Sequence, residues 1–248
     1  MISLVALTLA GSLALESTDS QKPTPLQQIE GQSKQGDPDA LFKLAVAYQR
    51  GRGVEENDAK AAELYREAAA KGDARAMANL GVMYSRGEGV AHDDATALGW
   101  YRKAADAGST KAMVMLGTRA AQGQGVDRNP AEAMAWYLKA AEQGDATAMY
   151  LAGVALLRST DRAELAEAHR WLRESADTGH APALTALGTA RLNGTGVATD
   201  HAEAVRLFRA AAELGDATAM ANIGIAHLEG KGVERDSKEG VRLYLIHI

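Results

Sequence analysis

The 248-residue sequence contains no cysteine, which excludes disulfide bonds, thiolate nucleophiles and cysteine-ligated metal sites. It also has no excess of positive charge, because 27 Lys and Arg residues stand against 32 Asp and Glu residues. Without a positive field to attract phosphates, we expect no nucleic-acid partner. Hydrophobic residues make up 46% of the chain and charged residues 24%, which is typical of a folded protein with a buried core.

The motifs of common catalytic sites are missing as well. H-E-x-x-H, G-x-S-x-G, S-x-x-K and EF-hand patterns do not occur, and the spacing around Gly230 and Lys231 does not match a phosphate-binding loop. We therefore expect a protein that is not an enzyme and that has no cofactor and no metal site.

The sequence also lacks a hydrophobic run long enough to span a bilayer comfortably, so we expect no stable membrane span. The first residues, MISLVALTLAGSLALES, fit the apolar region of a secretory signal peptide, with Ser12-Leu13-Ala14 as its cleavage site. No Lys or Arg follows Met1, so the usual positive start of a signal is missing. If Met1–Ala14 is a signal peptide, we expect a periplasmic or secreted protein, and otherwise a cytoplasmic one. A buried N-terminal segment and a short anchor are the alternatives.

Glycine is plentiful, and it recurs at a fixed period. It divides the chain into six units: 37–72, 73–108, 109–144, 145–179, 180–215 and the incomplete 216–248. Self-similarity at this period indicates a stacked array of supersecondary units. Residues 1–22 precede the array as a possible signal peptide and polar linker. Residues 23–36 are predicted to form a capping half-repeat, with Thr24 as the helix cap and Pro25 in the first turn.

Each unit is predicted to begin with a helix. A side chain able to cap that helix opens five units, and His180 opens the sixth. The capping residues are Asp37, Asp73, Ser109, Asp145 and Asp216. A glycine recurs inside this helix in five units, where it costs about 1 kcal/mol relative to alanine. We therefore predict that a neighbouring helix passes too close for a β-carbon at Gly81, Gly117, Gly153, Gly188 and Gly224.

A column of long side chains follows the small alanine of each first helix. It consists of Leu41, Met77, Met113, Met149, Leu184 and Met220. We interpret this column as core, and an adaptable methionine-rich binding surface is the alternative. The six histidines occupy unrelated repeat positions, so we interpret them as packed or solvated side chains and not as metal ligands.

A glycine pair and a second helix complete each unit. The pairs Gly51/Gly53, Gly87/Gly89, Gly123/Gly125, Gly194/Gly196 and Gly230/Gly232 predict a turn in which positive φ ends the first helix. Predicted caps of the second helix are Asn57, Asp93, Asn129, Asp200 and Asp236, with capping boxes to Glu132, Glu203 and Glu239. Its buried face is predicted to carry alanines together with Leu64, Tyr65, Trp100, Tyr101, Trp136 and Tyr137.

The second unit resembles the Sel1-like repeat family, a relative of the tetratricopeptide repeats, in two motifs. These are A-x-x-x-L-G-x-x-Y-x-x-G-x-G-V from Ala76 to Val90 and D-x-x-x-A-x-x-W-Y-x-K-A-A-x-x-G from Asp93 to Gly108. The resemblance covers residue 37 to the C-terminus. It implies an all-α fold, a right-handed α-solenoid of stacked antiparallel helix-turn-helix units, and a role as an adaptor or scaffold in bacterial envelope or regulatory processes. The alternative function is that of a β-lactamase or cell-wall-directed hydrolase, as described for some cysteine-rich members, but this chain lacks every cysteine.

By the same resemblance, two first-helix columns line the concave surface, and arginines stand one turn further on. We predict a groove with an apolar floor and a basic rim that binds an acidic or amphipathic segment of a protein partner. Its residues are Phe42, Val46, Arg50, Val82, Arg86, Val114, Thr118, Tyr150, Val154 and Arg158. The alternative is that these are scattered surface residues without a common function. We expect a monomer.

Two irregularities leave alternatives open. The fourth unit lacks the glycine pair and is one residue shorter, so its residues 156–162 could bend the solenoid, present a contact loop or reflect drift of a degenerate repeat. The last unit stops at Ile248 with an apolar tail, which indicates either a truncated chain, a fragment of a larger regulatory protein or an edge that meets a partner.

Overall fold

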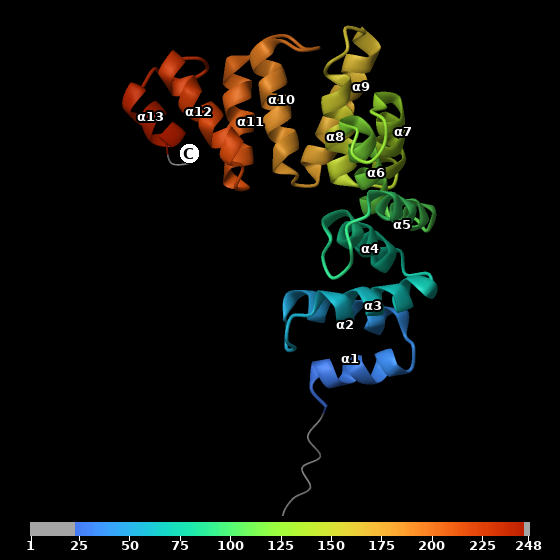
Figure 1. The fold of residues 1–248 in the computed structure, drawn as a ribbon. Coiled ribbons are helices and arrows are strands. Elements are labelled where there is room, and N and C mark those ends of the chain that lie inside the picture. Colours follow the sequence, from blue (N-terminus) through green and yellow to red (C-terminus); the bar gives the residue numbers. More distant parts are fainter. Residues whose placement is uncertain (1–22, 246–248) are drawn as a thin grey trace, which may run out of the picture.

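The computed structural model describes residues 23–245, and across them the chain forms 13 α-helices and no strand (Figure 1). A first helix, α1, spans Pro25–Lys34. The first helices of the six units are α2 (Pro38–Arg50), α4 (Ala74–Arg86), α6 (Thr110–Gln122), α8 (Ala146–Leu156), α10 (Ala181–Asn193) and α12 (Ala217–Glu229). The second helices are α3 (Asp58–Ala70), α5 (Asp94–Asp106), α7 (Pro130–Ala141), α9 (Arg162–Asp177), α11 (His201–Glu213) and α13 (Ser237–Leu245). The predicted signal peptide lies outside the described residues.

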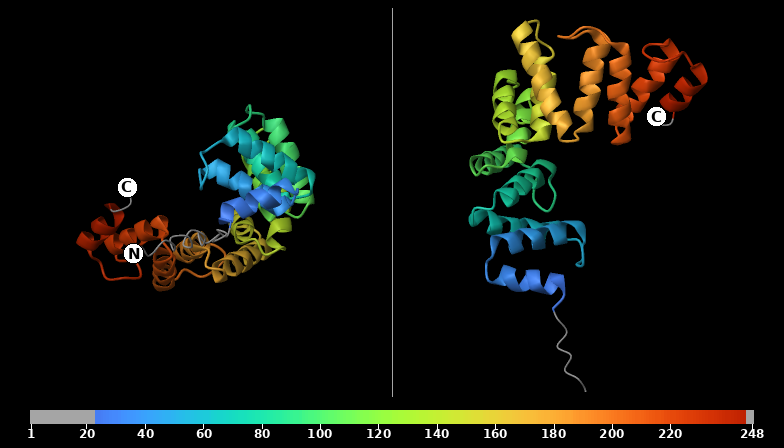
Figure 2. Two further views of the ribbon diagram at one scale, coloured as in Figure 1. Left: turned by 90° about the horizontal axis from the view of Figure 1, so that it is seen from below. Right: turned by 180° about the vertical axis from the view of Figure 1, so that it is seen from behind.

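The helices stack in chain order, each on its sequence neighbours, so the prediction of an all-α solenoid is confirmed. The stack is not straight. Helices α1–α5 form one arm and α10–α13 a second arm, with α6–α9 in the bend between them (Figure 1). The views from below and from behind show the same curved stack (Figure 2). The inner side of this bend is the concave face of the molecule.

Helix ends follow the predicted capping residues. Asp37, Asp73, Ser109, Asp145 and Asp216 each accept a backbone N–H of the first turn, while His180 makes no such bond. Thr24 caps α1 as predicted and forms a reciprocal capping box with Gln27. The capping boxes predicted for the second helices are wrong, because the backbone N–H of each cap residue donates to a carbonyl of the preceding first helix. The carboxylates of Glu203 and Glu239 pair instead with Arg206 and Arg242, three residues further along. At the third predicted box, the Glu132 carboxylate accepts long bonds of 3.5 Å from the Asn129 side chain and from Trp136 Nε1, and none from the Asn129 backbone.

The helical glycines lie against large side chains of the second helix of their own unit. A β-carbon on Gly81 would lie 2.5 Å from the ring of Tyr101, and one on Gly117 would lie 2.6 Å from Tyr137. Gly153 and Gly188 face Leu172 and Phe208 in the same way. The predicted close approach is therefore confirmed at Gly81, Gly117, Gly153 and Gly188. These second-helix side chains lie at the centre of their units, and Tyr101, Leu172 and Phe208 among them are at most 2% exposed, as is Tyr65 in unit one. Two tryptophans predicted on the buried face, Trp100 and Trp136, are instead half-buried.

The glycine pairs end the first helices with positive φ, as predicted, but the second glycine of a pair has a further role. Gly89 has φ +65°, and its α-carbon lies over the backbone of Asp58 and Ala59 at the start of α3 in the preceding unit. Gly232 lies in the same way over His201 at the start of α11. The loop of one unit therefore packs on the first turn of the unit before it. The fourth unit has no glycine pair, so no glycine takes this place in its loop.

The core consists of buried clusters that bridge neighbouring units. One cluster joins units one and two, and the largest joins units two, three and four. The methionine column belongs to this core at Leu41, Met113 and Met149, which are at most 9% exposed. Helix α1 adds Leu26 and Ile29 to the first cluster, so it covers the apolar end of the stack.

Candidate partner-binding groove

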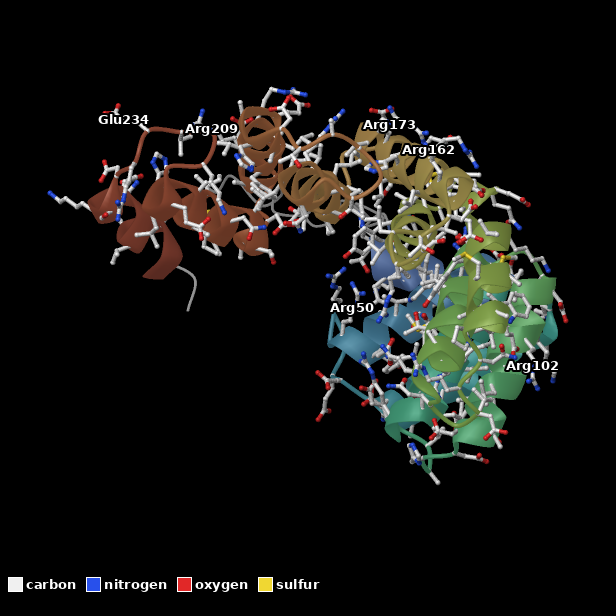
Figure 3. The ribbon with its side chains drawn as sticks, turned by 90° about the horizontal axis from the view of Figure 1, so that it is seen from above. Arg50, Arg102, Arg162, Arg173, Arg209 and Glu234 are labelled. Atoms are coloured by element: carbon white, nitrogen blue, oxygen red, sulfur yellow. The ribbon has the colours of Figure 1, made fainter. Side chains whose placement is uncertain are left out.

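A groove of about 690 Å³ opens on α2, α4 and α6 of the first three units. Val46, Val82 and Met115 give it an apolar part, and Gln49, Asn79, Ser85, Lys111 and Thr118 give it a polar part. Arg50, from the last turn of α2, lies on the inner side of the bend, whereas Arg102 of α5 lies at the outer edge (Figure 3). The groove is therefore part of the concave face.

A chain of hydrogen bonds crosses the groove from unit one to unit three. The Tyr65 hydroxyl donates to Gln49 Oε1 at 2.9 Å and accepts from Asn79 Nδ2 at 2.9 Å. Lys111 Nζ donates to Asn79 Oδ1 at 3.4 Å. Burial raises the pKa of Tyr65, although the hydrogen bond from Asn79 opposes this, so the hydroxyl stays protonated and can donate. The network holds two side-chain amides at the centre of the groove.

A buried arginine closes the groove on the side of unit three. Arg119 is 7% exposed, and its Nη1 donates to Asp94 Oδ1 at 2.8 Å and to the Gln124 carbonyl at 3.3 Å. Its Nη2 donates to the Ser85 hydroxyl. The guanidinium thereby ties α6 to α4 and to the start of α5 in the preceding unit.

Sequence reasoning missed Arg119, although the repeat carried a signal for it. The other five units have alanine or methionine at this position, at Ala47, Met83, Ala155, Ala190 and Ala226. A single arginine in a column of small or apolar residues indicates a site-specific role, because burying a guanidinium requires partners for its donors.

The charged rim contains both signs. Arg50 and Arg86 stand at the ends of α2 and α4, as the basic rim requires, and Arg86 pairs with Glu88 at 3.4 Å. Glu56 and Asp58 line the same groove from the loop and the first turn of α3. The lining is therefore mixed in charge and not uniformly basic.

A smaller and mainly apolar hollow of about 350 Å³ adjoins the groove. Leu26 and Ile29 of α1 form one wall, and Phe42 and Val46 of α2 form the other. Val46 lines both the hollow and the groove. The two spaces are therefore neighbours on one surface.

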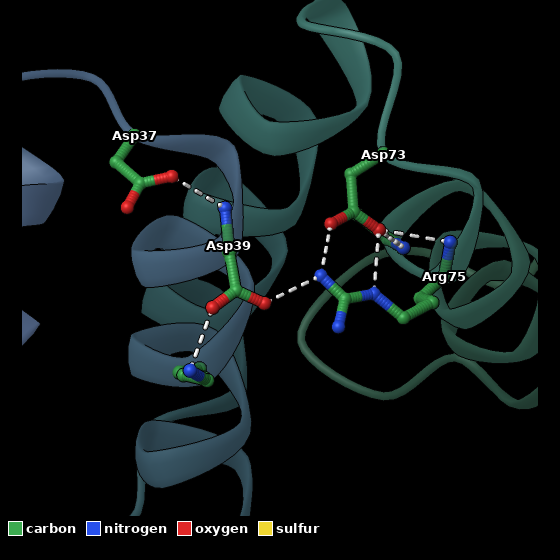
Figure 4. A network of polar contacts seen from close by, with 6 residues as sticks. Asp37, Asp39, Asp73 and Arg75 are labelled. Carbon is green, nitrogen blue, oxygen red and sulfur yellow. Dashed lines mark hydrogen bonds and ion pairs between the residues drawn. The ribbon is translucent and has the colours of Figure 1, made fainter.

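An ion-pair network holds α4 against α2 beside this surface (Figure 4). Arg75 donates to Asp73 of its own helix end at 2.6 Å and to Asp39 of the preceding unit at 2.8 Å, and Lys43 lies 2.6 Å from Asp39. The guanidinium also stacks 4.2 Å from the centre of the Phe42 ring. Lys43 and Arg75 lower the pKa of Asp39, so its carboxylate stays charged.

The structure brings together half of the residues predicted for the groove. Val46, Arg50, Val82, Arg86 and Thr118 line it. Phe42 lies in the adjoining hollow. Val114 is 7% exposed and belongs to the core, so it offers no surface to a partner. The three predicted residues of unit four do not line the groove: Tyr150 packs on His180, Val154 packs on the core, and Arg158 is exposed at the end of the shortened α8.

Within residues 23–245, no helix combines the length and the apolar character needed to cross a bilayer. The same part of the chain holds no group of three or more His, Asp or Glu side chains placed to bind a metal ion.

The Sel1 repeat family model matches the chain six times in succession. The matches cover residues 38–73, 74–109, 110–145, 146–180, 181–216 and 217–246. Each match begins one residue after the residue that opens the corresponding helix pair. No curated protein gives a significant match.

Solved structures show the same fold. A Sel1 repeat protein from Oxalobacter formigenes is 28% identical over 87% of each chain, with a TM-score of 0.78. The protein c5321, a protective antigen of uropathogenic Escherichia coli with an SLR fold, is 30% identical over 90% of this chain, with a TM-score of 0.57. The match covers 59% of the c5321 chain. The immunity protein Pa5087 of Pseudomonas aeruginosa is 22% identical over 84% of this chain and 81% of its own, with a TM-score of 0.55, which shows a shared fold alone.

Proposed function

Because the chain belongs to the Sel1 repeat family, we propose that it is a non-catalytic scaffold that binds a segment of a partner protein in the groove of α2, α4 and α6. The observation that supports this proposal is the groove itself, which is open, lies on the concave face and combines apolar and polar lining. The relatives described as a protective antigen and an immunity protein share the solenoid, which is consistent with a role in protein binding.

The rim favours a partner segment that carries carboxylates. Arg50 is exposed, and the structure gives it no ion-pair partner among residues 23–245. An arginine in this state can form a paired hydrogen bond with an incoming carboxylate, whereas Arg86 must first release Glu88. Acidic Glu56 and Asp58 nearby restrict the register of the segment, because like charges repel.

A pair of charge-reversal variants tests the proposal. Arg50→Glu with Arg86→Glu changes the rim, and Arg102→Glu with Arg209→Glu makes the same change in net charge on the outer side of the bend (Figure 3). Both variants and the wild type serve as bait for affinity capture from the native envelope and soluble fractions, after circular dichroism has shown equal folding. A protein retained by the wild type and by the outer variant, but lost from the rim variant, supports the groove. Equal retention by all three baits contradicts it.

We propose in addition that the protein is exported through its N-terminal apolar segment and acts as a monomer. Mass measurement and N-terminal sequencing of the mature protein from its native cell test export, because cleavage after Ala14 removes a defined mass. Sedimentation equilibrium tests the oligomeric state, because a monomer should give the mass of a single chain.

A further inference from the structure

Helix α1 leaves an apolar hollow beside it, because α1 is shorter than the second helices whose place it takes in the stack. Its last residue, Lys34, precedes the last residue of α3, Ala70, by one repeat of 36 residues. Helix α1 nevertheless has 10 residues and α3 has 13. The capping box of Thr24 with Gln27 fixes the start of α1 at this later position. Helix α1 therefore lacks the first turn on which the loop of the next unit would pack.

The loop of unit one shows the consequence of the missing turn. In the loop of unit two, a β-carbon on Gly89 would lie 2.6 Å from the nitrogen of Ala59, in the first turn of α3. Gly53 holds the same place in the loop of unit one, but its β-carbon would meet only Leu26 Cδ2, at 3.4 Å. The side of α1 next to this loop is therefore open, where the hollow of about 350 Å³ lies between α1 and α2.

The lining of this hollow is apolar apart from two cations. It consists of Pro25, Leu26, Ile29, Phe42, Val46 and Ala47 together with Lys43 and Arg52. No Asp or Glu among residues 23–245 lines the hollow, whereas Glu56 and Asp58 line the neighbouring groove. Lys43 is paired with Asp39 at 2.6 Å. Arg52 is exposed and has no ion-pair partner in the described part of the chain, so the hollow offers its free charge to an anion.

The volume and the lining together specify a class of ligand. Small-molecule sites occupy about 300–1,000 Å³ and are mainly apolar, with a few polar groups that fix the orientation of the ligand. Because a water-sized group occupies about 30 Å³, the hollow has room for roughly ten carbon atoms of an aliphatic chain. Such a chain suits the apolar lining, and a carboxylate at its end can form paired hydrogen bonds with the guanidinium of Arg52.

We propose that the hollow binds a medium-chain fatty acid, with its aliphatic chain against Leu26, Ile29 and Phe42 and its carboxylate on Arg52. This site goes beyond the proposed function, because it takes a small amphiphile and needs no protein partner. Val46 lines both the hollow and the groove, so the bound chain would lie next to the apolar part of the groove.

Calorimetric titration of the full chain with saturated carboxylates, from hexanoate to dodecanoate, tests the site. Each ligand is kept below the concentration at which it forms micelles, and decylammonium supplies the same chain with the opposite charge. Each methylene that enters the hollow should strengthen binding roughly fourfold, and the gain should stop once the hollow is full. Decanoate should bind at least about tenfold more tightly than decylammonium, because only the carboxylate can pair with a guanidinium.

Two pairs of variants locate the ligand, after circular dichroism has shown equal folding. Arg52→Glu reverses the charge at the hollow, and Arg102→Glu makes the same change at the outer edge of the bend (Figure 3). Ala47→Met fills the hollow with the side chain that Met83 places at this repeat position in unit two, and Ala155→Met is the control in unit four. Arg52→Glu should weaken decanoate binding at least about tenfold, and Ala47→Met should end the gain at a shorter chain. Both controls should bind as the wild type does.

Three results would each overturn the proposal: an affinity that does not grow with chain length, equal binding of decanoate and decylammonium, or unchanged binding by Arg52→Glu. The alternative occupants give a different pattern. If no carboxylate binds, and Ala47→Met loses a captured protein or a dimer, the hollow belongs to a partner protein or to a second copy of the chain. A partner that depends on the rim arginines but not on Ala47→Met leaves the groove as a separate site, so the two proposals can fail independently.

Discussion

Replacing Gly89 by alanine tests the contact by which one unit packs on the next. A β-carbon at Gly89 would lie 2.6 Å from the nitrogen of Ala59 and closer still to the carbonyl of Asp58. Both atoms belong to the backbone at the start of α3, so neither can move without shifting that helix. Gly89 also has φ +65°, a conformation that costs other residues about 1–2 kcal/mol.

Gly87→Ala is the matched control, because it separates the two causes. Gly87 has nearly the same conformation, φ +71°, but its β-carbon would meet His92 Cβ at 3.4 Å, an ordinary contact. We expect a loss of about 1–2 kcal/mol at Gly87 from backbone strain alone. At Gly89 the overlap adds about 1–3 kcal/mol, for a total of about 2–5 kcal/mol.

Urea unfolding followed by circular dichroism measures the difference in the free energy of unfolding, and hydrogen exchange locates it. Stability in a repeat array is the sum of unit and interface terms, so Gly89→Ala should increase exchange mainly in α1 to α3. Equal losses for the two variants would refute the reasoning, because the loop would then make no restrictive contact with the preceding unit.

Three further predictions concern single side chains. His180→Ser should raise stability by about 0.5–1 kcal/mol in thermal unfolding, because the added cap and the removal of a buried ring nitrogen without a partner outweigh the lost ring contact with Tyr150. Burial lowers the pKa of His180, so its protonation in the unfolded chain should widen this gain from about pH 7 to pH 5, and a constant or negative difference would contradict the account. Burial raises the pKa of Asp73, but hydrogen bonds from Arg75 and the backbone lower it more, so the charged carboxylate stabilises the fold above about pH 4 and this stabilisation is lost as the pH falls. Acid unfolding should therefore be steeper in the wild type than in Arg75→Gln. Parallel curves would argue against a stabilising role of this ion pair. Arg119→Met should cost about 1–2 kcal/mol in urea unfolding, because the hydrogen bonds of the guanidinium are lost. The cost stays small, because Met83 shows that methionine fits this position and the half-exposed Asp94 carboxylate can return to water. An unchanged midpoint would mean that the buried guanidinium adds no net stability.

The repeat sequence by itself determined the helices and their ends. Caps such as Asp73 and Thr24 act on the amides of their own first turn, and the glycine pairs act through their own φ angles. These are interactions within a few residues of one another, so their spacing is visible in the sequence. The close approach at Gly81 was also predictable, because a helical glycine repeated at one position needs a packing reason.

The capping boxes show where local spacing fails. Glu203 has the spacing that a box requires, but Arg206 lies one turn further along the same exposed face. Arg206 forms charge-assisted hydrogen bonds with both carboxylate oxygens, and the backbone N–H of Asp200, which a box requires, donates to the Arg191 carbonyl at 2.9 Å. The spacing rule describes what a side chain can reach, and competition with its neighbours decides what it binds.

Only the tertiary structure decided which residues form the groove. Its hydrogen-bonded side chains come from three units, namely Gln49, Tyr65, Asn79 and Lys111. Up to 32 residues separate two side chains that share a hydrogen bond, so no local sequence pattern connects them. The curvature of the stack, which follows from small packing differences between successive units, places unit three in the groove and leaves Tyr150 of unit four outside it. The sequence determined the elements because their hydrogen bonds are local, and the structure decided the binding surface because its contacts join units that are distant along the chain.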